Sequence, residues 1–156
     1  MGDTPFTVEL LRTDGPWMME TGRPGFWQYL NIVAHEEMAA AFATLFWPEF
    51  IEVEGCVLLR EHYEAANFAS WKDTLKGDRQ QIEAMINHVH LCDLFLNNNP
   101  LGGSHPRVLA YLGQTLARSW PHALQETFPE KHFVVDYDED PDWNYYGPEI
   151  TFWQDR

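Results

Sequence analysis

The segment Phe50-Ile-Glu-Val-Glu-Gly-Cys-Val-Leu-Leu59 carries the clearest strand pattern in the chain. Apolar residues recur there at every second position, as they do on the buried face of a β-strand. That face would consist of Ile51, Val53, Val57 and Leu59. A glycine inside a strand often marks a bulge. The segment therefore predicts one half-buried strand, with a bulge at Gly55.

Shorter strand patterns lie towards both ends of the chain. They cover Phe6–Leu11, His132–Tyr137 and Glu149–Gln154. The two C-terminal segments are separated by an acidic loop that contains proline and glycine. Together with the central segment they predict one antiparallel sheet of about four strands.

Helical periodicity dominates the regions between these strands. Apolar residues of Phe26–Trp47 form one stripe that Pro48 ends, and Glu64–Lys76 is a second helix that stops at Gly77. The expected buried stripe of the first helix is Leu30, Val33, Ala34, Met38, Ala41, Phe42 and Leu45. In the second helix Phe68, Trp71 and Leu75 are expected to point inward.

Two further helices are expected before the C-terminal strands. Asp78, with Gln81 three residues later, is typical of a helix N-cap, and the helix it opens extends to about Leu96. A fourth begins at Ser104 and should kink or restart at Pro121. Its inward residues would include Leu109, Leu116 and Trp120. Strands at the ends and helices between them predict an α+β domain spanning 1–156, with about four helices mainly on one face of the sheet.

The charge balance limits the class of partner. The chain has 24 acidic and 10 basic residues, which give a formal net charge of −14. A negative field of this size repels nucleic acid and anionic membranes and attracts cations and basic proteins. We therefore expect no nucleic-acid or membrane partner, and a basic protein is the favoured class of partner.

The expected location is the cytoplasm. Cys56 and Cys92 are the only cysteines and have apolar neighbours, which is typical of core residues and not of a disulfide framework. The first 15 residues lack the basic and apolar regions of a secretory signal. The apolar stretch Phe26–Trp47 is interrupted by His35-Glu-Glu37, so no membrane span is predicted.

The segment His88-Val-His-Leu-Cys-Asp93 is the best candidate for a metal site. On the predicted helix 78–96, His88 shares a face with Cys92, and His90 shares the neighbouring face with Asp93. Such side chains ligate zinc-type ions. Another ligand would have to come from His35, Glu36 or His62. The competing interpretation is a core helix with hydrogen-bonded histidines.

Other catalytic motifs are incomplete or missing. His35-Glu-Glu lacks the second histidine of H-E-x-x-H, because position 39 is Ala. Asp136-Tyr-Asp-Glu-Asp140 begins like a calcium-binding EF-hand loop, but Pro141 and Gly147 occupy positions that require a flexible residue and a glutamate. The chain contains no P-loop, dinucleotide fingerprint or Cys-x-x-Cys, so no nucleotide or redox cofactor is expected.

The loop around 136–146 combines acidic and aromatic side chains. Such a surface offers large contact areas together with electrostatic attraction to a cationic protein. We expect the partner-binding residues to be Asp136, Asp138, Glu139, Asp140, Asp142, Trp143, Tyr145 and Tyr146. Alternatively, the aromatic rings pack onto the core and the acids only face water.

These observations favour a non-enzymatic protein-binding module that engages a basic partner through the acidic-aromatic loop. In size and charge the chain is similar to bacterial immunity or antitoxin-like proteins, which mask basic toxins. This resemblance rests on bulk properties and implies no site residues. The alternative is a metal-dependent enzyme that uses His88, His90, Cys92 and Asp93. A small-molecule binder with an aromatic pocket is a third possibility, compatible with the seven tryptophans.

Overall fold

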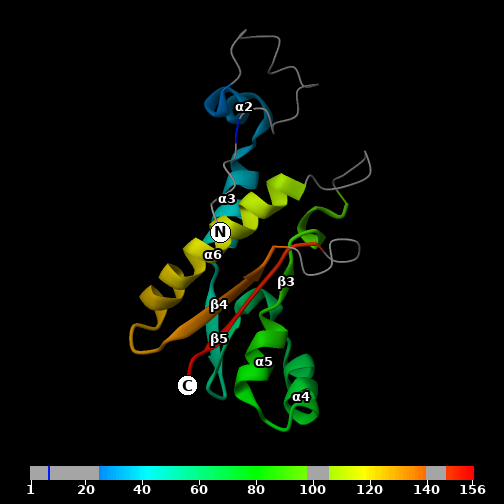
Figure 1. Ribbon diagram of the computed structural model, residues 1–156, viewed down its shortest axis with the longest axis vertical. Coiled ribbons are helices and arrows are strands. Elements are labelled where there is room, and N and C mark those ends of the chain that lie inside the picture. The colour runs from blue at the N-terminus through cyan, green and yellow to red at the C-terminus, as the bar shows by residue number, and fades with distance from the viewer. Residues whose placement is uncertain (1–6, 8–24, 98–105, 140–146) are drawn as a thin grey trace.

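A computed structural model describes residues 7, 25–97, 106–139 and 147–156 (Figure 1). In these ranges the α-helices are α2 (Phe26–Val33), α3 (Glu36–Phe46), α4 (Ala65–Thr74), α5 (Arg79–Ile86) and α6 (Pro106–Thr127). The strands are β1 (Phe50–Val53), β2 (Cys56–Leu59), β3 (Val89–His90), β4 (Phe133–Asp138) and β5 (Glu149–Gln154). Two 3₁₀ turns are η2 (Arg60–His62) and η3 (Asp93–Phe95). The predicted strand Phe6–Leu11 lies outside the described residues apart from residue 7.

The strands form two antiparallel sheets, which confirms the predicted α+β class. One sheet pairs β1 with β2, and the other has the order β3-β5-β4. The C-terminal strands β4 and β5 pair along their whole length, from Phe133 opposite Gln154 to Asp138 opposite Glu149. The single sheet of about four strands is thus replaced by sheets of two and three strands among the described residues.

The segment Phe50–Leu59 is a hairpin, and its prediction as one strand was wrong. Glu54 and Gly55 have φ angles of 51° and 82°, as a two-residue turn with positive φ at both positions requires. The turn shifts the alternation by one residue, so the predicted common face is wrong: Ile51 and Val53 share a face with Leu58 and Cys56, whereas Val57 and Leu59 lie on the opposite face. All four residues of β2 are buried, because one face contacts the main core and the other a second core around Phe68 and Ile82.

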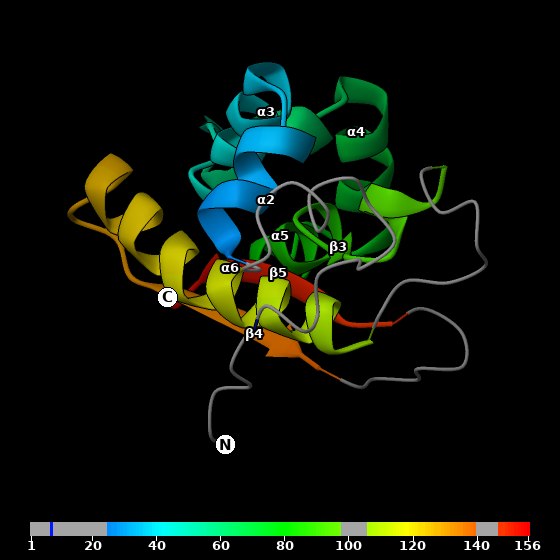
Figure 2. The same cartoon turned by 90° about the horizontal axis from the view of Figure 1, so that it is seen from above.

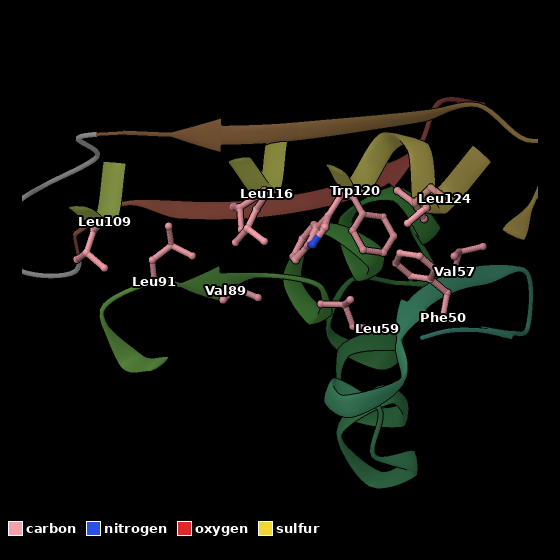
Figure 3. Close-up of a cluster of buried hydrophobic side chains, with 12 residues drawn as sticks. Phe50, Val57, Leu59, Val89, Leu91, Leu109, Leu116, Trp120 and Leu124 are labelled. Carbon is pink, nitrogen blue, oxygen red and sulfur yellow. The ribbon is translucent and has the colours of Figure 1, made fainter. Parts of the chain in front are cut away.

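Helix α6 covers one face of β4 and β5, and the main core lies beneath it (Figures 2 and 3). The predicted inward residues Leu109, Leu116 and Trp120 are all buried. The Trp120 ring packs edge-on against Phe152 of β5, and its Nε1 donates to the carbonyl of Leu45 at 3.0 Å. The helix continues through Pro121 to Thr127, so this proline does not restart it.

Helix α5 joins the two sheets through two buried polar side chains, Glu83 and Asn87. Asn87 Oδ1 accepts from Leu59 N at 2.9 Å, and its Nδ2 donates to the carbonyls of Val57 and Phe152. These backbone groups belong to β2 and β5, on the edges that face each other. The side chain of Asn87 therefore makes the hydrogen bonds that a neighbouring strand would otherwise make to these backbone groups.

Glu83 makes the same kind of bridge one helical turn earlier. Its carboxylate accepts hydrogen bonds from Val57 N at 2.8 Å and from Gln154 N at 2.9 Å. Arg156 and the side chain of Gln154 also donate to it. As a result α5 lies beside the part of β5 that β3 does not cover, while α6 packs on a face of the sheet and runs alongside β4 and β5 (Figures 1 and 2). The helices therefore do not all pack on one face.

The predicted helix 26–47 is divided in two. Ala34 and His35 are extended between α2 and α3, and neither helix contains a buried residue. Trp27 is 87% exposed and Leu30 51% exposed, although the apolar stripe predicted a buried face. Both helices extend beyond the sheets (Figure 1).

The turn between α4 and α5 agrees with the sequence signals. Helix α4 ends at Thr74, two residues before the predicted end, and the chain then turns through Lys76 and Gly77, which have φ angles of 53° and 77°. The Gly77 N–H donates to the carbonyl of Lys72. Asp78 is the N-cap of α5 and accepts a hydrogen bond from Gln81 N at 3.2 Å. No helix among the described residues has the length and apolar content to cross a lipid bilayer.

Candidate metal centre

The predicted helix over 78–96 ends at Ile86, and the chain then becomes extended. Asn87, the C-cap of α5, has φ and ψ of −82° and 0°. Its side chain bonds to both sheets, which fixes the position where the chain leaves the helix. The next residues form β3, whose register places Val89 opposite Ile150 and His90 opposite Glu149.

Alternation along this extended segment places His88 and His90 together. Val89 and Leu91 are buried in the main core, so His88 and His90, which alternate with them, point to the other side (Figure 3). The two imidazole rings have centroids 4.4 Å apart, at an interplanar angle of 62°. Because the backbone is extended here, residues two positions apart share a face, and not residues four positions apart as in the predicted helix.

Glu149, the first residue of β5, completes the cluster. His88 Nε2 lies 3.0 Å from Glu149 Oε2, and His90 Nδ1 lies 3.5 Å from the same oxygen. One ligand atom from each of the three residues lies within 4.8 Å of the others. The side chains are 26%, 26% and 31% exposed, so the group is held by the fold yet remains accessible to solvent.

Two imidazoles and one carboxylate suit a first-row divalent metal ion. Imidazole favours zinc, copper, iron and nickel, while carboxylate oxygens add negative charge and harder ligands. Typical bonds are about 2.0–2.2 Å long, so a separation of 4.8 Å or less lets three such atoms reach one ion after small side-chain rotations. Three protein ligands leave at least one coordination position for water or substrate.

The structure does not bring Cys92 and Asp93 into this cluster. The expected helical pairing of His88 with Cys92 is wrong, because those residues are not helical relative to each other. Cys92 packs against the main core, and burial raises the pKa of its thiol, with the charge of Asp93 adding to the effect. Asp93 is exposed at the start of η3.

The other predicted sources of a metal ligand are also elsewhere. His35 and Glu36 lie at the start of α3, outside the described metal-ligating group. His62 Nδ1 lies 2.9 Å from the carbonyl of Ile86. Glu149 was missed because the segment around His88 was interpreted as a helix. The alternation His-Val-His-Leu91 is itself a strand signal and could have revealed that this segment is extended.

The acidic-aromatic loop is described only in part. Asp136 and Asp138 are exposed on the side of β4 that points away from α6. Glu139 accepts a hydrogen bond from Gln114 Nε2 at 3.1 Å. The remaining predicted partner-binding residues lie outside the described residues: Asp140, Asp142, Trp143, Tyr145 and Tyr146.

The chain matches no protein-family profile, no curated protein sequence and no solved structure at a significant level.

Proposed function

We propose that this chain binds a divalent first-row metal ion through His88, His90 and Glu149, as expected for a metal-dependent enzyme. The observation that carries the proposal is the convergence of three ligand atoms within 4.8 Å, from strands paired in register. These residues are far apart in the sequence, and both strands are anchored in the core by Val89 and Ile150. A preorganised set of ligands reduces the entropic cost of binding.

The reactions that such a site could catalyse depend on the coordination positions of the metal ion that the three protein ligands do not fill. A metal bound by three protein side chains lowers the pKa of a coordinated water to about 7 in catalytic zinc sites and polarises a bound carbonyl or phosphoryl group. Partial exposure of the three ligands supports access for water and a small substrate. Metal-assisted hydrolysis is therefore the reaction class that the arrangement favours.

The test is metal uptake by chelator-treated protein, measured by isothermal titration calorimetry with Zn²⁺. We expect one equivalent to bind, and each of His88→Ala, His90→Ala and Glu149→Gln to weaken binding at least tenfold. His122→Ala is the matched control, because His122 is an exposed histidine on α6. Circular dichroism of the metal-free variants checks that they fold. Failure of the natural chain to bind, or undiminished binding by the His88 and His90 double variant, contradicts the proposal.

Binding of a basic protein is a second proposed function, in the manner of an immunity or inhibitor-like module. It is supported by Asp136 and Asp138, which project from the exposed side of β4, and by the net charge of −14. Affinity for the partner should fall steeply with salt, because the attraction is long-range. It should also fall when Asp136→Lys is combined with Asp140→Lys. If the affinity for a basic partner changed neither with salt concentration nor with the double substitution, this function would be excluded.

We also propose a cytoplasmic location. Its support is the pair of free cysteines, Cys56 and Cys92, which pack in the second and main cores respectively. Free thiols persist in reducing compartments. Fractionation of cells that produce the natural chain tests the location, and recovery in a secreted or membrane fraction would contradict it.

A further inference from the structure

One row of residues crosses the three-stranded sheet beside the metal-binding cluster. Glu149 of β5 lies opposite His90 of β3 and also opposite Asp138 of β4. Residues directly opposite each other in antiparallel strands point to the same face, with Cβ atoms about 4.5–5.5 Å apart. Asp138 therefore shares the face of His90 and Glu149.

The pairing of Asp138 with Glu149 places two carboxylates on neighbouring strands at the same level. Like charges directly opposite each other destabilise a sheet. A divalent cation between them would convert this repulsion into attraction. The Asp138 carboxylate is not among the ligand atoms that lie within 4.8 Å of one another, so it would reach the ion only after a side-chain rotation.

We infer that Asp138 is the fourth ligand of this metal centre, an inference that rests on the proposed metal-binding function. The resulting set of ligands is two imidazole nitrogens and two carboxylate oxygens, one residue each from β4 and β5 and two from the β3 segment. Carboxylate-rich sites suit harder, six-coordinate ions such as Mn²⁺. A six-coordinate ion would keep two positions open, whereas a tetrahedral zinc ion would be fully ligated by the protein.

The experiment compares Asp138→Asn with Asp136→Asn in the full chain. Asp136 is a matched control, since it lies on the same strand and face but opposite Thr151. Mn²⁺ and Zn²⁺ are titrated separately into chelator-treated protein, and affinities are measured by calorimetry. We expect Asp138→Asn to weaken Mn²⁺ binding at least tenfold and Asp136→Asn to weaken it less than threefold.

Thermal unfolding without metal supplies a second readout. Metal-free Asp138→Asn should keep a cooperative thermal transition, so that its lower Mn²⁺ affinity reflects the lost ligand and not a loss of fold. Equal, small losses of affinity in both aspartate variants would show a general charge effect and overturn the inference. Metal binding that survives Asp138→Asn but not His90→Ala would overturn only the fourth ligand. Absence of binding by the natural chain would overturn the whole centre.

Discussion

Glu83 is a carboxylate with no solvent exposure, and its burial is compensated entirely by hydrogen-bond donors. Backbone N–H groups of Val57 and Gln154 donate to it, and Arg156 supplies the opposite charge. Burying a charge is costly unless it is paired, so removing one partner of such a group is more damaging than removing an exposed ion pair. Asn87 also connects β2 to β5, but through hydrogen bonds of an uncharged side chain.

We predict that Glu83→Ala lowers the free energy of unfolding by about 3–5 kcal/mol. Asn87→Ala should lower it by about 3 kcal/mol, since three buried backbone groups lose a partner at about 1 kcal/mol each. Urea unfolding followed by circular dichroism gives both values. Glu61→Ala, at an exposed position in η2, should change stability by less than about 0.5 kcal/mol. A similar small change in Glu83→Ala would disprove the bridging role.

Gly113 allows the ring of Tyr137 to lie against α6. A Cβ atom at position 113 would lie 2.2 Å from Tyr137 Cε2, closer than atoms can approach. Gly113→Ala should therefore destabilise the protein by about 1–3 kcal/mol, although alanine favours helices. The same substitution in a Tyr137→Ala background should cost much less. A double-mutant cycle measures this coupling, and additive effects would contradict it.

Tyr137 also predicts a loss of stability in alkali. Burial raises the pKa of its phenol, and the negative charges of Glu139 and Asp138 raise that pKa further. The folded state thus keeps the proton above pH 10, where the unfolded state releases it, so stability falls as the pH rises through about 10. Tyr137→Phe should be less stable at pH 8, because it loses the hydrogen bond to the Ala110 carbonyl. Denaturation from pH 8 to 11 should show this deficit shrinking, and a constant deficit would refute the prediction.

At the scale of single elements, α6 contains an internal proline at an exposed position. Pro121 cannot donate to the carbonyl of Ala117, and its ring crowds that carbonyl. We predict that Pro121→Ala stabilises the protein by about 1–3 kcal/mol. Thermal and urea unfolding measure the gain, with Ala substituted at the exposed, non-proline position His122 as a control for helix propensity. A loss of stability would contradict this prediction and would mean that Pro121 contributes to packing.

Local signals were sufficient for several elements and insufficient for others. The cap at Asp78 and the positive φ of Gly77 depend on neighbouring residues only, and the sequence signalled both, although α4 ends at Thr74 and not at Lys76. The hairpin at Glu54 and Gly55 was not, because Glu54 is a poor signal for a turn that needs positive φ. The segment after Ile86 was misassigned because its apolar residues also fit a helical period.

At the scale of the whole molecule, stability is distributed unevenly. Helices α2 and α3 contain no buried residue, whereas α6 and β5 contribute many of the core side chains. Elements with few buried contacts open at low free-energy cost. Hydrogen-exchange mass spectrometry should therefore show exchange in α2 at least tenfold faster than in the centre of α6. Equal protection of both helices would contradict this distribution.

The sequence by itself determined the α+β class, the acidic charge, four helical regions and the pairing of two C-terminal strands. Each of these depends on composition or on periodicity within one segment. Only the tertiary structure decided that α5 bridges two sheets and that Glu149 meets His88 and His90. The bridges from α5 span 26 to 71 positions of the sequence, and His88 and His90 lie about 60 positions before Glu149. Their positions depend on strand register and core packing, which no local pattern encodes, because the free energy that sets them comes from burial shared between distant segments.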